Sequence, residues 1–125
     1  MLTMTHTVEI PMRLDAYNKY IDKNRRNKFM ANKYKQDVES VLMYYLKVLP
    51  KIENPVRICI TWVEENRRRD PDNVASAKKF IIDSLVKSGK LQNDTHKFVK
   101  GFTDDFEFAK ESKIILKLVE VDDND

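Results

Sequence analysis

The order of apolar and polar residues in the first half of the chain predicts one short strand and one long helix. Residues 7–10, Thr-Val-Glu-Ile, alternate polar and apolar up to a proline, which is typical of a short strand. The next segment is rich in Asn, Asp, Arg and Lys and contains Tyr17 and Tyr20, and we expect a loop there. From about Phe29 to Leu49 the apolar residues recur at helical spacing until another proline, so a helix is predicted.

The second half begins with a buried strand that leads into a second helix. Residues 56–63 form a β-branched run of strand length, in which we expect Cys59 and Trp62 to pack in the core. A polar run then leads into a helix from about Asn73 to Ser88, which Gly89 ends as its C-terminal cap. The predicted apolar face of this helix comprises Val74, Ala77, Ile81, Leu85 and Val86.

Two further apolar segments complete the predicted fold. Residues 98–102 and 114–121 predict two more strands, which makes the order of elements β-α-β-α-β-β. A length of 125 residues suits one domain that spans residues 1–125. We therefore expect a single small α/β domain, with a mixed sheet of about four or five strands and two main helices.

The composition excludes several classes of protein. Hydrophobic residues make up 42% of the chain, but no apolar run approaches the roughly 18 residues of a membrane span, so we expect a soluble protein without membrane contact. The first residues lack the basic region and apolar stretch of a signal peptide. The single cysteine excludes an intramolecular disulfide and a cysteine-rich zinc site. Together these features predict a cytoplasmic protein.

The positive charge is concentrated in two clusters. The net charge is only +3, but seven basic residues and one acid lie between Lys19 and Lys35, and Arg67, Arg68 and Arg69 are consecutive. Such clusters can attract a polyanion such as nucleic acid. On charge alone, a solvated surface is the simpler interpretation.

The densest group of reactive side chains lies where the buried strand leads into the second helix, in residues 67–73, Arg-Arg-Arg-Asp-Pro-Asp-Asn. Pro71 favours an extended backbone at Asp70, so the carboxylates of Asp70 and Asp72 can point the same way. Two carboxylates held close together repel each other unless a cation lies between them, and Mg²⁺ prefers such oxygen ligands. Helix capping by Asp72 or Asn73 explains one acid, but not both acids together with three arginines.

A second polar group follows on the helix and beyond it. Residues four and seven apart share a helix face, which predicts one polar stripe of Asp72, Ser76, Lys79 and Asp83. Lys79 is suited to stabilise phosphate charge and Asp83 to orient Lys79, although an ordinary surface ion pair is the simpler interpretation. A third acid, Asp94, follows in a turn, and spacing leaves open whether it reaches the first two acids.

One ordered set of residues resembles a known family. The set comprises Arg-Asp-Pro-Asp-Asn at residues 69–73, then Lys79, Asp83, Leu85, Gly89 and the pair Asn93-Asp94. These residues resemble the RusA family of Holliday junction resolvases. Residues 17–21, Tyr-Asn-Lys-Tyr-Ile, followed by Arg-Arg-Asn-Lys at 25–28, are similar to the phage-type members of that family. The similarity spans about residues 11–121, and its specific part is residues 69–94.

The resemblance implies a homodimeric, Mg²⁺-dependent endodeoxyribonuclease, with Mn²⁺ able to substitute and no organic cofactor. Such an enzyme resolves four-way DNA junctions by paired symmetric nicks in DNA recombination and repair, in a bacterial or phage-infected cell. Carried over onto this sequence, the metal ligands and catalytic acids are Asp70, Asp72 and Asp94, and the catalytic lysine is Lys79. The expected DNA contacts are Arg67, Arg68, Arg69, Lys19, Lys23, Arg25, Arg26 and Lys28.

The chain departs from the family pattern in the spacing before the lysine. The typical pattern is Asp-Asn-x-x-Lys-x-x-x-Asp, whereas five residues separate Asn73 and Lys79 here. Three extra residues are close to one helical turn, so Lys79 keeps its face but moves along the helix axis. Alignment on Asp83 selects Lys79, and Lys78 is the competing assignment. Asn93 stands where the family has the first acid of a pair.

Two other functions stay open. A non-catalytic nucleic-acid-binding module needs only the basic clusters and predicts salt-sensitive binding, but it gives no reason for Asp70, Asp72 and Asp94. A metal nuclease for flaps, forks or other branched DNA uses the same site, and sequence does not separate it from a junction resolvase.

Overall fold

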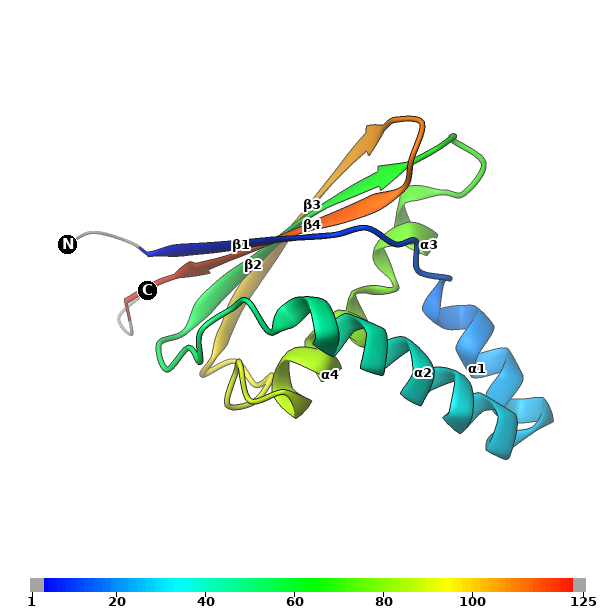
Figure 1. The fold of residues 1–125 in the computed structure, drawn as a ribbon, viewed down its shortest axis with the longest axis horizontal. Helices are drawn as coiled ribbons and strands as arrows, with labels where there is room; N and C mark the ends of the chain where they lie inside the picture. The colour runs from blue at the N-terminus through cyan, green and yellow to red at the C-terminus, as the bar shows by residue number, and fades with distance from the viewer. Residues whose placement is uncertain (1–3, 123–125) are drawn as a thin grey trace.

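The computed structural model describes residues 4–122 and shows a sheet with helices packed against one face (Figure 1). The strands are β1 (Thr5–Ile10), β2 (Val56–Glu64), β3 (Val99–Phe108) and β4 (Lys113–Glu120). The helices are α1 (Tyr17–Arg26), α2 (Lys28–Leu46), α3 (Pro71–Ala75) and α4 (Lys78–Lys87). None of the helices within residues 4–122 is long and apolar enough to cross a membrane.

The sheet is mixed and has the strand order β1-β4-β2-β3. Strand β4 pairs antiparallel with both β1 and β2, whereas β2 and β3 are parallel. Parallel neighbours need a crossover connection, which α3 and α4 provide. The C-terminal ends of β2 and β3 therefore lie at the same end of the sheet, where Glu64 is paired with Phe108. The predicted fold class, a small α/β domain with a mixed sheet, is confirmed.

The core lies between the helices and one face of the sheet. Alternate residues of the two central strands are buried there, namely Ile58, Ile60, Trp62, Ile114, Leu116 and Leu118. The fully buried Phe80 ring of α4 lies 5.0–6.2 Å from three tyrosine rings, those of Tyr17, Tyr20 and Tyr34. This aromatic cluster joins α1 and α2 to α4.

Helix α1 corrects one prediction. The expected loop around Tyr17 and Tyr20 is wrong, because these residues lie in the first turn of α1. The segment is polar overall, but two tyrosines three positions apart share one helix face and pack against Phe80. Tertiary packing of that face stabilises a helix whose other residues are polar. The predicted first long helix is confirmed as α2, although it ends at Leu46.

The predicted helix over residues 73–88 is divided into α3 and α4, so the expectation of one continuous helix is wrong. At the break, the Ser76 hydroxyl donates a hydrogen bond to the Asn73 carbonyl oxygen (2.7 Å) and accepts one from the Tyr17 backbone N–H (3.0 Å). The start of α1 is thus anchored at the break. Gly89 directly follows Ser88, the C-cap residue of α4, and its φ of +76° confirms the predicted glycine at the end of this helix.

Strand β3 continues beyond the predicted end at residue 102 and reaches Phe108. Its second half is mostly polar, which hid the strand. Pairing with β2 extends to the end of both strands, and the Trp62 indole N–H donates a hydrogen bond to Asp104 (2.9 Å). A neighbour distant in sequence, rather than the local pattern, extends this strand. The other strands, predicted at residues 7–10, 56–63 and 114–121, are confirmed.

Acid is expected to weaken the contact that Glu120 makes at the end of β4. The hydrogen bond with His6 (2.7 Å), assisted by one from Asn54 (2.9 Å), holds the pKa of the Glu120 carboxyl below its usual value. A carboxyl with a lowered pKa stabilises the fold above its unfolded pKa, and this stabilisation is lost as pH falls through the folded pKa. Urea unfolding at about pH 6 and about pH 3 should show a smaller loss of stability for Glu120→Gln than for the wild type. Equal losses in both proteins would contradict this assignment.

Candidate functional site

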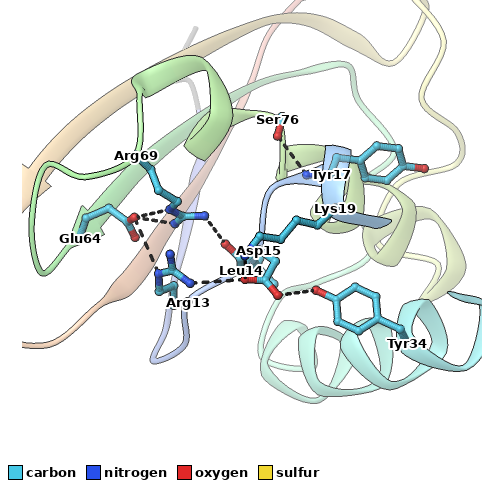
Figure 2. Close-up of polar contacts among 9 residues, drawn as sticks. All are labelled: Arg13, Leu14, Asp15, Tyr17, Lys19, Tyr34, Glu64, Arg69 and Ser76. Carbon is cyan, nitrogen blue, oxygen red and sulfur yellow. Dashed lines mark hydrogen bonds and ion pairs between the residues drawn. The ribbon is translucent and has the colours of Figure 1, made fainter. Parts of the chain in front are cut away.

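The loop that carries the arginines is fixed to the body of the protein by Arg69 (Figure 2). Its Nε and Nη2 donate to Glu64 Oε1 at 3.0 and 2.5 Å, and its Nη1 donates to the Leu14 carbonyl oxygen at 2.9 Å. These bonds join the end of β2, the segment before α1 and the start of α3. Arg69 therefore has protein partners, whereas Arg67 and Arg68 are exposed to solvent.

Asp15 connects the same segment to α2. The Tyr34 hydroxyl donates a hydrogen bond to Asp15 Oδ2 (3.2 Å), and the Lys19 ammonium lies 3.7 Å from Oδ1 of the same carboxylate (Figure 2). Burial and then the charge of Asp15 raise the pKa of Tyr34 to about 12, so its hydroxyl stays protonated as a donor. Tyr34 is therefore a structural residue, and Lys19 is shared between Asp15 and solvent.

The two acids at the start of α3 are exposed. Asp70 is the N-cap residue, with an extended backbone (φ −69°, ψ 152°) as the following proline predicts. Its side chain makes no capping hydrogen bond, and Asp72 is exposed in the first turn. The alternative in which Asp72 or Asn73 is the N-cap residue is therefore wrong. Capping does not account for the Asp70 carboxylate.

Lys79 of α4 contacts Asp94, the third of the predicted acids. Its ammonium lies 3.0 Å from Asp83 Oδ1, which confirms the predicted pair, and 3.5 Å from Asp94 Oδ2. The turn after α4 therefore folds back to this helix, which spacing left open. The hydrogen bond from Lys79 to Asp83 is the main cause that raises the pKa of Lys79, with the charge of Asp94 as a further contribution. Lys79 is thus a stable cation in the neutral range.

The neighbouring lysine contacts a different element. Lys78 forms an ion pair with Asp104 on β3, and its ammonium lies 4.9 Å from the centre of the Phe102 ring. It fastens α4 to the edge strand of the sheet. Of the two lysines considered for the catalytic role, Lys79 is the one that contacts Asp94.

The three predicted metal ligands come from two segments. Carboxylate oxygens suit Mg²⁺, but within residues 4–122 no three His, Cys, Asp or Glu side chains lie close enough to share one ion. Asp94 is paired with Lys79, and Asp70 and Asp72 lie around the start of α3. This arrangement does not fit a preformed three-carboxylate metal centre.

The other basic cluster lies at the connection between α1 and α2. Its exposed side chains come from the last turn of α1 and the first turn of α2, namely Lys23, Arg25, Arg26 and Lys28. The Asn27 side chain accepts a hydrogen bond from the Met30 backbone N–H (3.1 Å) and so caps α2. This end of the helical hairpin points away from the sheet (Figure 1).

Sequence reasoning missed the two phenylalanines near the arginine loop. A cavity of about 310 Å³ is lined by Arg67, Asp70, Phe106 and Phe108, among others. The available signal was the alternation of Phe106 and Phe108, which places both side chains on one face if the strand continues.

No protein-family model matches the chain, and no significantly similar curated protein was found.

Proposed function

We propose that this protein is an endodeoxyribonuclease that cuts branched DNA, with the four-way junction as its substrate. The observation that carries the proposal is the contact between Lys79 of α4 and Asp94 of the following turn. These two residues and Asp70 and Asp72 are the reactive members of the ordered set that resembles the RusA family. The contact brings two of them together from separate positions in the chain, as a shared site requires.

The exposed cations would bind the DNA backbone. Arg67 lines the same cavity as Asp70, Arg68 is exposed on the same loop, and the end of the α1–α2 hairpin carries four more basic residues. Contacts to phosphates position a protein on DNA without reading its sequence. Lys79, as a stable cation, is suited to balance the negative charge that develops on the phosphoryl oxygens.

Mg²⁺ is the proposed cofactor, with Mn²⁺ as a substitute, and its proposed ligands are Asp70, Asp72 and Asp94. In the arrangement described above, the Asp94 carboxylate is paired with Lys79. The three carboxylates do not form one preformed site, so the proposed metal requirement rests on the resemblance and is tested by EDTA in the cleavage assay.

A homodimer is proposed because a junction has two strands to cut. A two-fold pair of protomers would present two identical sites, and two identical sites can cut opposite strands symmetrically. Light scattering after gel filtration measures this state directly. A monomer at concentrations that support paired nicking would contradict it.

The wild-type protein is expected to introduce paired nicks in an end-labelled four-way junction with Mg²⁺ or Mn²⁺, and to spare the matched linear duplex. EDTA should abolish the nicks. Asp72→Asn should reduce their rate by at least about 100-fold, because the change removes a carboxylate that the site needs. The variant changes an exposed residue, so its unfolding curve should match that of the wild type.

Other outcomes of this assay decide between functions. Salt-sensitive binding of the junction without cleavage under every metal condition would overturn the enzyme and favour the binding module. Metal-dependent cutting of flaps or forks in preference to the junction would retain the nuclease and change its substrate. Unreduced cleavage by Asp72→Asn would remove this residue from the site.

A further inference from the structure

Two aromatic residues at the end of the sheet, Phe106 and Phe108, line the cavity near Asp70. Phe106 and Phe108 of β3 are paired in register with Trp62 and Glu64 of β2, so they lie at the C-terminal ends of two parallel strands. The Ala109 backbone N–H donates to the Glu64 carbonyl oxygen (3.0 Å), which ties the end of β3 to β2. In open α/β sheets, ligands bind outside the carboxyl ends of the strands.

The chemistry of the cavity wall suits a flat aromatic ligand. The Arg67 guanidinium lies 4.0 Å from the centre of the Phe108 ring, and this ring is 42% exposed. Phe106 is partly buried, packs against the core and also lines this cavity. Phenyl rings and guanidinium planes are the groups on which proteins stack unstacked nucleic-acid bases. At about 310 Å³, the cavity has the size of small-ligand pockets.

The charges around the cavity favour a nucleotide over an apolar peptide side chain. Arg67 and Arg68 are exposed at this loop, whereas the charge of Arg69 is balanced by Glu64. A base that enters the cavity carries a phosphate, and the exposed arginines provide charge complementary to it. Asp70 also lines the cavity, so a nucleotide bound there would lie next to this candidate site residue.

We infer that this cavity binds an unpaired base of the DNA substrate by stacking against Phe108 and Arg67, next to Asp70. The inference rests on the proposed function, since it takes DNA as the ligand. A base within a duplex is stacked on both faces, so only a base that has left the stack can enter. The cavity would thereby favour branched DNA with a base unpaired at the branch point over continuous duplex.

The test is equilibrium binding in EDTA, with a fluorescein-labelled duplex that contains one extrahelical base and the same duplex fully paired. The wild type should bind the first DNA about tenfold more tightly, which corresponds to about 1.4 kcal/mol, because only this DNA offers a base that can stack on the aromatic ring. Phe108→Ala should abolish this preference and leave affinity for the paired duplex within about twofold. Phe108→Trp, which keeps an aromatic ring, should retain the preference.

Phe102→Ala is the matched control, because Phe102 lies on the same strand, is 45% exposed and does not line the cavity. It should keep the wild-type preference. Thermal melting establishes that each variant is folded. An unchanged preference in Phe108→Ala, or an equal loss with both DNAs, would overturn the inference while junction cleavage still stands. If the wild type binds neither these DNAs nor the junction, the proposed function fails and the inference with it.

Discussion

Under the proposed function, replacing Lys79 with methionine is expected to lower the rate of junction cleavage by about 10²–10³-fold, because the candidate site loses the cation proposed to balance charge in the transition state. The effect should appear in kcat rather than in binding, since several other exposed cations are proposed to bind the DNA backbone. Asp83 keeps a second partner, Lys35, at 3.3 Å, and Asp94 is half exposed. The variant should therefore stay folded, with its loss confined to catalysis.

Lys78→Met is the matched control for this prediction. The two lysines are adjacent, but Lys78 is paired with Asp104 and fastens α4 to β3. Its loss should lower thermal stability and leave the rate of cleavage by the folded protein within a few fold. Single-turnover cleavage rates at saturating protein measure both variants. A large loss of rate in Lys78→Met with little loss in Lys79→Met would reverse the assignment of the lysine.

Replacing Phe80 with alanine is expected to lower the free energy of unfolding by about 3–5 kcal/mol, which is the range for removing a large buried aromatic side chain. The Phe80 ring is fully buried, and it contacts tyrosine rings from α1 and α2 at 5.0–6.2 Å. Its removal opens a cavity among three helices and loosens the hairpin that carries four basic residues. Urea denaturation measures the loss.

Phe29→Ala is the control for the stability experiment, because the Phe29 side chain is 78% exposed at the start of α2. Its effect should stay within about 0.5 kcal/mol, as expected for a surface substitution. A loss below about 1 kcal/mol in Phe80→Ala would contradict the joining role of the aromatic cluster.

The elements that the sequence predicted correctly have local signals. The strand at residues 56–63 is a β-branched run, α2 has helical spacing over several turns, and Gly89 has the conformation that glycine adopts most readily. The pair of Lys79 with Asp83 was also predictable, because a spacing of four residues brings two side chains together on any helix. In each case the residues that decide the structure are neighbours in the chain.

The errors occur where a distant partner decides the structure. Helix α1 forms because Tyr17 and Tyr20 pack against Phe80, which lies some sixty residues further along the chain. Strand β3 reaches Phe108 because it pairs with β2 along the whole length of β2, although the sequence of the second half of β3 is mostly polar. The break between α3 and α4 is where Ser76 accepts a hydrogen bond from the Tyr17 backbone.

For the candidate site, the sequence by itself determined the types of side chain, the extended backbone at Asp70 and the ion pair of Lys79 with Asp83. Only the tertiary structure decided that Asp94 meets Lys79, that Lys78 instead faces Asp104, and that Arg69 is held by Glu64. Backbone restriction by proline and helical periodicity act over a few residues, so a pattern reveals them. Contacts between segments depend on how the whole chain packs, which no short pattern contains.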